Sequence, residues 1–317
     1  MIKKILIFVF LFFVSSELIL RLSQFYATHT EKTINVFINP FKQKFEGHYK
    51  ANSEHEINTT EFSFRHIYDK FGFRNESNLS KDAEILAFGD SFTEGMGTHQ
   101  DSTWVKFLSQ KLDKTIYNAG KIGSDPHFYL NEYRRIRNNI NVDKVIVLLN
   151  FSDIADFRFR HSKEIKCDVN INLYKNLHLY RFYNHFLLGK DYMFLQKKNR
   201  KELLKKILED IITTIIELDK ECKEDNRKLL VFIHPLPQQY YKNLDSRLNF
   251  NYIENLAFQL NLNCVKTFSL RNDLEKLIET KENWRKISWE IDGHFNAKGY
   301  KSLADVIYSK LMTTKDF

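Results

Sequence analysis

From Ala83 onward, the sequence alternates short apolar runs with longer segments of helical periodicity. The apolar runs are rich in strand-forming residues, and most end in turn residues: Ile85 to Phe88, Thr115 to Tyr117, Lys144 to Leu149, Leu229 to Ile233 and Cys264 to Phe268. Strands that alternate with helices predict an α/β domain built on a parallel sheet. We therefore expect five parallel strands in this part of the chain.

Helices are expected between and after these strands, at residues 104–112, 128–137, 201–220, 252–260 and 297–311. In the third of these segments, apolar residues such as Leu204, Ile211 and Leu218 recur at helical spacing, and charged residues lie off that stripe. This pattern indicates a face that packs on the sheet.

The N-terminus begins with Lys3 and Lys4, followed by an unbroken apolar run from Ile5 to Val14. A cleaved signal peptide has an apolar region of about 7–15 residues, whereas a spanning helix needs about 20. The stretch from Ile5 to Leu22 is short for a span and contains Glu17, so residues 1–24 are either a signal anchor or a signal peptide. Both interpretations place the remaining chain outside the cytoplasm, either held at the membrane or secreted.

Residues 25–81 show no clear periodicity and are interpreted as a membrane-proximal linker with a β-rich lead-in, and residues 82–317 as the α/β domain. A chain of 317 residues with 43% hydrophobic residues can bury a full core. Its net charge of +8 is scattered and accompanies no nucleic-acid motif, so we expect no nucleic-acid partner. The three cysteines are far apart and predict neither a disulfide framework nor a zinc site, and no motif predicts a cofactor.

Two segments, some two hundred residues apart, carry side chains suited to nucleophilic catalysis. Ser91 follows the first predicted strand, and Asp292 and His294 precede the last predicted helix. A serine hydroxyl needs a base, and an imidazole acting as that base needs a carboxylate to hold its other N–H. We therefore expect Ser91 as nucleophile, His294 as base and Asp292 as its partner. The alternatives are that Ser91 caps a helix N-terminus and that His294 is an ordinary loop histidine.

Four sequence blocks resemble, in order, those of the SGNH/GDSL hydrolases. They are Gly89-Asp90-Ser91, Asn118-x-Gly120-x-x-Gly123, the loop ending in Asp153, and Asp292-x-His294-x-Asn296-x-x-Gly299. The resemblance covers roughly Ala83 to the C-terminus, and Tyr68 to Arg74 is similar to the lead-in of the family's membrane-anchored bacterial branch. It implies a flavodoxin-like three-layer α/β/α fold with a five-stranded parallel sheet and an esterase activity.

The resemblance also implies an oxyanion hole made of the backbone N–H groups of Ser91 and Gly123 and an asparagine side chain just before the aspartate of the third block. Here that position is Ser152, and Asn150 lies two residues earlier. Either Ser152 or Asn150 is expected to supply the third donor. The alternative for Gly123 is an ordinary turn glycine.

The stretch at about 157–200 interleaves aromatic and basic residues, and we interpret it as a helical insertion beside the site. Its aromatics are expected to pack on the sheet; the alternative is contact with sugars or lipid headgroups.

The resemblance and the expected location together predict a serine ester hydrolase acting on a small ester, foremost an acetyl group on a cell-envelope or extracellular glycan. Two alternatives stay open. One is an O-acyltransferase that uses the same three residues, and the other is a non-catalytic glycan-binding or assembly protein with a degenerate oxyanion hole.

Overall fold

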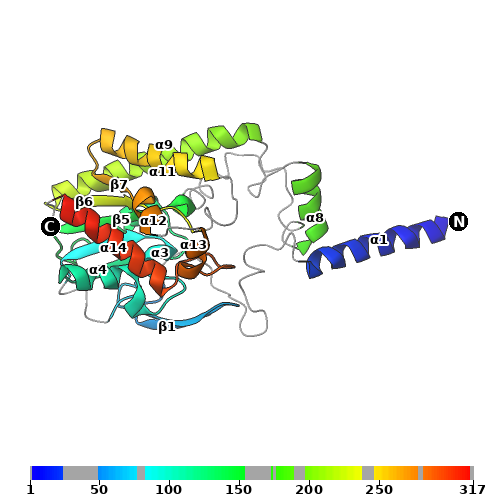
Figure 1. The fold of residues 1–317 in the computed structure, drawn as a ribbon, viewed down its shortest axis with the longest axis horizontal. Helices are drawn as coiled ribbons and strands as arrows, with labels where there is room; N and C mark the ends of the chain where they lie inside the picture. Colours follow the sequence, from blue (N-terminus) through cyan, green and yellow to red (C-terminus); the bar gives the residue numbers. More distant parts are fainter. Residues whose placement is uncertain are drawn as a thin grey trace.

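The computed structural model describes residues 2–23, 49–76, 83–153, 173, 176–188, 197–237, 246–277 and 281–314. Most of the insertion predicted at about 157–200 and the larger part of the predicted linker lie outside these described residues. The α/β domain, an N-terminal helix and a small β-hairpin are visible in Figure 1.

The domain is built on a five-stranded parallel sheet in the order β4-β3-β5-β6-β7. Its strands are β3 (Ile85–Gly89), β4 (Ile116–Gly120), β5 (Lys144–Leu149), β6 (Lys228–Ile233) and β7 (Thr267–Ser269). The fold class predicted from the sequence is confirmed. Because β4 and β5 lie on opposite sides of β3, the chain changes direction at β3, and ligands bind such sheets at the carboxyl ends of the strands around this point.

The predicted start of the fifth strand at Cys264 is wrong. Cys264 has φ 60°, a left-handed conformation, and the Val265 N–H donates to the Leu260 carbonyl at 3.0 Å. This segment therefore forms the turn that ends the preceding helix, and the strand begins at Thr267.

All five predicted helices are present: α4 (Trp104–Leu112), α5 (Pro126–Ile136), α9 (Lys197–Glu224), α11 (Ser246–Leu262) and α14 (Ala297–Thr313). Two further helices, α12 (Arg271–Leu277) and α13 (Lys281–Ile287), were not predicted. Each has seven residues, which is too short for an apolar period to stand out from the sequence.

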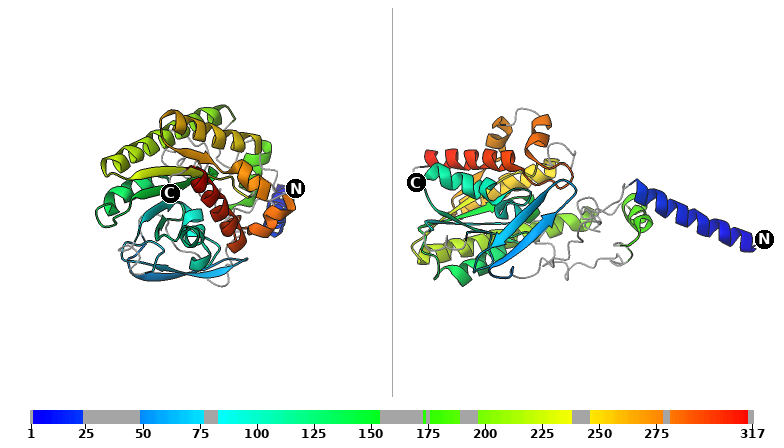
Figure 2. Two further views of the ribbon diagram at one scale, coloured as in Figure 1. Left: turned by 60° about the vertical axis from the view of Figure 1, so that its left-hand side comes forward. Right: turned by 90° about the horizontal axis from the view of Figure 1, so that it is seen from below.

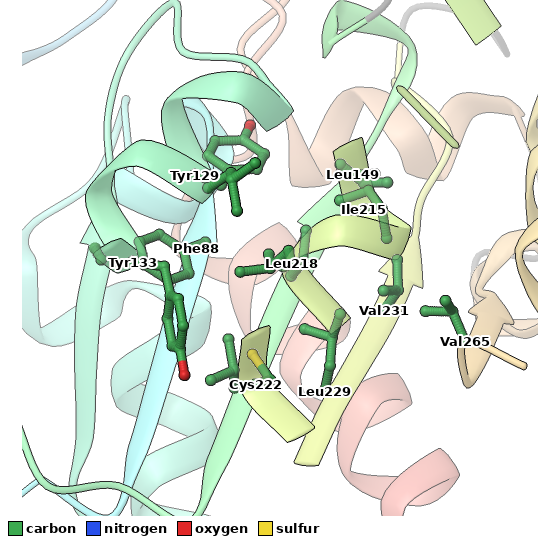
Figure 3. Close-up of a cluster of buried hydrophobic side chains, with 14 of the residues drawn as sticks. Phe88, Tyr129, Tyr133, Leu149, Ile215, Leu218, Cys222, Leu229, Val231 and Val265 are labelled. Carbon is green, nitrogen blue, oxygen red and sulfur yellow. The ribbon is translucent and has the colours of Figure 1, made fainter. Parts of the chain in front are cut away.

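The helices cover both faces of the sheet, so the domain has three layers (Figures 1 and 2). Leu86 and Phe88 of β3 belong to one apolar cluster with α5, α9 and α11, and Ile85 and Ala87 belong to a second with α4 and α14. Figure 3 shows Phe88 beside Tyr129 of α5, with ring centroids 6.2 Å apart. The strand that leads to Ser91 is therefore buried on both faces.

A two-stranded antiparallel hairpin, β1 (Ser53–Asn58) and β2 (Ser63–Tyr68), lies outside this sheet. Its Ile57 and Phe62 are buried together with Met96, which follows the Ser91 turn. Trp289 packs against the same cluster from the loop before α14. The predicted β-rich lead-in is thus a hairpin that packs on two loops of the α/β domain.

The N-terminal helix α1 (Ile2–Leu22) projects away from the α/β domain (Figure 1, and the right panel of Figure 2). Its most apolar 18-residue window has a mean hydropathy of 2.4, and none of its residues is buried. Among the described residues it is the one helix long and apolar enough to cross a membrane, a property that signal sequences share. Its C-terminal end contacts a short helix, α8 (His178–Phe182).

Candidate active site

Ser91 lies at the sharp turn where β3 ends and the short helix α3 (Ser91–Glu94) begins. Asp90 is the N-cap of this helix, and its carboxylate accepts the N–H of Phe92 at 2.9 Å. Because Asp90 caps the helix, Ser91 is the first helical residue and its hydroxyl is not used as a cap. The N-cap interpretation of Ser91 is therefore wrong.

The turn after β3 is tight because β4 passes directly behind it. A Cβ atom on Gly120 would lie 2.2 Å from the backbone nitrogen of Glu94, so glycine is required at this close approach. The Asn118 side chain connects the two segments. Its Nδ2 donates to the Thr93 carbonyl at 2.8 Å, and its Oδ1 accepts the Gly120 N–H at 2.9 Å. The Ser91 turn is thus fixed by backbone that belongs to the sheet.

His294 comes from the loop at residues 288–296, here called the His294 loop. Its Nε2 lies 2.7 Å from Ser91 Oγ, and its Nδ1 is hydrogen-bonded to Asp292 Oδ1. Asn296 caps α14 through the N–H groups of Lys298 and Gly299 and so fixes where this loop ends. The fold therefore joins Ser91, His294 and Asp292 in one chain of hydrogen bonds, and His294 is no ordinary surface histidine.

Two histidines near Ser91, the partly buried His294 and the fully buried His234, have pKa values shifted in opposite directions. Burial opposes charge on His294, yet the charge of Asp292 and the hydrogen bond to it raise the pKa of His294 above its ordinary value. Burial dominates at His234, which follows β6, and lowers the pKa of His234 to about 4. The His234 ring packs on Phe92, with centroids 4.8 Å apart. At neutral pH His234 is therefore an uncharged wall of the site.

The predicted oxyanion donors lie in the turns after β3 and β4. Gly123 has φ 68°, which places it in the left-handed region that favours glycine. Within the described parts of the chain, neither the Ser91 N–H nor the Gly123 N–H donates to a protein acceptor. The N–H groups of Ser91 and Gly123 are thus two available backbone donors.

Ser152 and Asn150 both point at Asp90. The Ser152 hydroxyl contacts Asp90 Oδ2 and Asn150 Oδ1, and the Asn150 amide donates to Asp90 Oδ2 at 3.1 Å. The Ser152 hydroxyl has one proton, which is engaged with these two acceptors. The Asn150 side-chain amide has two hydrogens, so one stays available after the bond to Asp90. Which of the two residues supplies a third donor stays a prediction.

Asp153 serves the architecture of this edge of the sheet. Its carboxylate accepts the Tyr129 hydroxyl at 2.6 Å and the Asn150 N–H at 2.7 Å. The loop that carries Asn150 and Ser152 is therefore tied to α5 by a buried hydrogen bond. Within the described residues, no group of three or more His, Cys, Asp or Glu side chains is placed to hold a metal ion.

Three residues that shape the site were not predicted from the sequence: Glu61, Glu94 and His234. The position of His234 directly after a strand was a usable signal, because side chains at the carboxyl ends of strands face the ligand edge. Glu61 and Glu94 gave no comparable signal, since their partners lie far away in the sequence: backbone N–H groups for both, and the His66 and Tyr68 side chains for Glu94.

No protein-family model matches the chain, and no curated protein sequence matches it. Solved structures with a similar arrangement include an esterase from Pseudoalteromonas sp., which is 15% identical with a TM-score of 0.43, covering 74% of this chain and all of that one. A putative lipolytic protein of the G-D-S-L family from Desulfitobacterium hafniense is 13% identical with a TM-score of 0.45, covering 72% and 98%. An acetyl-xylooligosaccharide esterase from Geobacillus is 12% identical with a TM-score of 0.45, covering 73% and 95%.

The strand order of the sheet, with β4 and β5 on either side of β3, is that of a flavodoxin-like fold. Three of the four sequence blocks lie at the carboxyl edge of the sheet, and the fourth lies just before the last helix. The chain therefore has the three-layer α/β fold that its resemblance to the SGNH/GDSL hydrolases implies.

Proposed function

We propose that this protein is a serine ester hydrolase that acts through an acyl-enzyme intermediate. The observation that carries the proposal is the continuous hydrogen-bond chain from Ser91 through His294 to Asp292. A serine hydroxyl is a weak nucleophile at neutral pH, and a neutral imidazole within hydrogen-bond reach of it supplies the required base.

In the proposed mechanism, Ser91 Oγ attacks the ester carbonyl while His294 Nε2 takes its proton. Asp292 holds the Nδ1 proton, fixes the tautomer and stabilises the imidazolium. The imidazolium then protonates the leaving alcohol, and the acyl group stays on Ser91. Water attacks this acyl-enzyme with His294 again acting as base, which releases the acid and restores Ser91.

The tetrahedral intermediates carry a negative oxygen that needs preorganised donors. We propose the backbone N–H groups of Ser91 and Gly123 as two of them. For the third donor we propose the Asn150 amide rather than the Ser152 hydroxyl. The second amide hydrogen of Asn150 supports this choice, because the single Ser152 proton is already engaged with Asp90 or Asn150.

We propose small acyl esters, foremost acetyl groups on a cell-envelope or extracellular glycan, as substrates. The support is the expected placement of the domain outside the cytoplasm together with the family resemblance. Transfer of the acyl group to a sugar hydroxyl would use the same residues, and product analysis with and without an added sugar acceptor separates the two reactions.

We further propose that α1 is retained as a membrane anchor. Glu17, near its C-terminal end, accepts the N–H groups of His178 and Leu179 at 3.0 and 2.8 Å and pairs with Arg21 at 2.7 Å. Cleavage near residue 16 would remove most of α1 and with it the helix that positions Glu17 against these N–H groups of α8. Intact-mass measurement of the membrane fraction tests the proposal: an unprocessed N-terminus supports it, and a chain cut after residue 16 or nearby contradicts it.

The test of the proposed activity is release of p-nitrophenol from p-nitrophenyl acetate by the full chain in detergent. Turnover that is lost in both Ser91→Ala and His294→Ala would support the proposal. A folded wild-type protein without turnover would favour the non-catalytic glycan-binding alternative.

A further inference from the structure

The β1–β2 hairpin is not part of the α/β domain, yet it contacts both loops that complete the site. We propose that this hairpin is a positioning element for catalysis, and that Glu61 at its tip holds the His294 loop in its active arrangement. The inference rests on the proposed function, because it assigns Glu61 a role in setting the base of that reaction.

Glu61 reaches the His294 loop from the turn between β1 and β2. Its carboxylate accepts the Asp292 N–H at 2.7 Å and the Ile291 N–H at 3.0 Å. The turn itself is held by Thr59, whose hydroxyl oxygen accepts the N–H groups of Glu61 and Phe62 at 3.2 and 3.0 Å. Hydrogen bonds to a carboxylate are stronger than those between neutral groups, so Glu61 fixes the backbone that carries Asp292.

Aromatic packing supports this contact. Phe62 lies beside Trp289, with ring centroids 5.3 Å apart, and the Trp289 indole N–H donates to the Gly97 carbonyl at 2.7 Å. The Trp289 N–H donates to the His294 carbonyl at 2.9 Å. The hairpin tip, the His294 loop and the segment after α3 therefore form one packed unit.

The other end of the hairpin contacts the opposite side of the site. His66 and Tyr68 of β2 bind the buried Glu94 carboxylate at 3.0 and 2.8 Å. Glu94 also accepts the Ile122 N–H at 2.7 Å, directly before Gly123. Through Glu94 the hairpin holds the turn that carries a proposed oxyanion donor.

Loss of the Glu61 carboxylate should change His294 through Asp292. The charged groups that influence His294 are Asp292 on its own loop and Asp90 and Glu94 beside Ser91, and the charge of His294 in turn lowers the pKa of the neighbouring His234. Without Glu61, Asp292 holds the imidazolium less well and a nearby negative charge is gone. Both effects lower the pKa of His294.

The experiment compares the full chain with Glu61→Ala, Glu61→Gln and a control, Glu56→Ala, which removes an exposed carboxylate from the same hairpin. We expect Glu61→Ala to lower kcat about 10–100-fold with little change in KM and to move the acidic limb of the pH profile to lower pH. Glu61→Gln keeps a carbonyl acceptor and should recover part of the loss. Glu56→Ala should match the wild type.

A second measurement does not depend on turnover. Titration of the His294 ring by NMR, assigned by its absence in His294→Ala, should give a lower pKa in folded Glu61→Ala than in the wild type. Should Glu61→Ala fail to fold, Glu61→Gln is compared in its place. An unchanged His294 pKa and kcat, or an equal effect of Glu56→Ala, would overturn the inference. If the wild type lacks turnover but Glu61→Ala still lowers the pKa of His294, the proposed function is refuted and the positioning role of Glu61 stays intact.

Discussion

The Ser91 turn and the His294 loop face each other across 2.7 Å, but different forces hold them. The Ser91 turn follows a strand whose residues are fully buried on both faces, and the neighbouring strands leave it little freedom. The His294 loop lies between the short helix α13 and the long helix α14, and contacts outside the sheet hold it, notably those of the Glu61 carboxylate and the Trp289 indole. Ser91 is therefore positioned by the core of the α/β domain, and His294 by contacts that lie outside the sheet.

The largest effect should come from the nucleophile itself. Ser91→Ala should reduce turnover about 10³-fold or more, because the covalent route is lost while oxyanion donors remain. Since Ser91 Oγ makes no helix-capping bond, the melting temperature should stay close to that of the wild type. Activity assay and thermal denaturation of the same preparation check this, and retained turnover would exclude Ser91 as the nucleophile.

The next largest effect should distinguish the two candidates for the third oxyanion donor. Asn150→Ala should lower kcat by about 10²–10³-fold, because it removes a donor made for the transition state. Ser152→Ala should cost less, since its proton is already bonded to a neighbouring acceptor. Steady-state kinetics on both variants decide the matter, and a greater loss in Ser152→Ala would reverse the assignment.

The activity should fall on the acidic side as His294 takes up a proton. Because the pKa of His294 is raised, this fall in activity should be centred above pH 6.5, the ordinary pKa of histidine. Below that pKa the imidazolium cannot accept the Ser91 proton, so kcat/KM should decline about tenfold per pH unit. A pH profile of kcat/KM measures this, and an acidic limb well below pH 6.5 would show that Asp292 does not stabilise the imidazolium.

The smallest effect on rate should come from a change within the core. Tyr129→Phe removes the buried hydroxyl that donates to Asp153 and leaves that carboxylate oxygen without its partner. We expect a loss of about 1–3 kcal/mol in the free energy of unfolding with kcat changed less than in Glu61→Ala. Chemical denaturation and kinetics together test this contrast between the two regions. A larger loss of kcat in Tyr129→Phe than in Glu61→Ala would contradict this contrast.

The same contrast explains what the sequence could predict. Strands such as Ile85–Gly89 are recognisable because burial on both faces leaves a continuous apolar run, and helix α9 because its apolar stripe is long. Ser91, Asp292 and His294 could be named because their chemistry and order resemble a known pattern. The strands, the helix and each separate sequence block are recognisable from residues that are close together in the sequence.

What could not be predicted depends on contacts between distant segments. The bond from Glu61 to the Asp292 N–H spans 231 residues, and nothing near Glu61 marks it. Likewise, the engagement of Ser152 with Asp90 follows from how two strand ends are placed side by side. The short helices α12 and α13 were missed because seven residues carry too little periodicity.

The central claim is that Ser91 is a nucleophile activated by His294. The most direct test is to treat the folded full chain with a fluorophosphonate and to identify the modified residue by peptide mass spectrometry. The account predicts one adduct, on Ser91, that forms far more slowly in His294→Ala. A folded protein without an adduct on Ser91, or one labelled equally fast without His294, would contradict it.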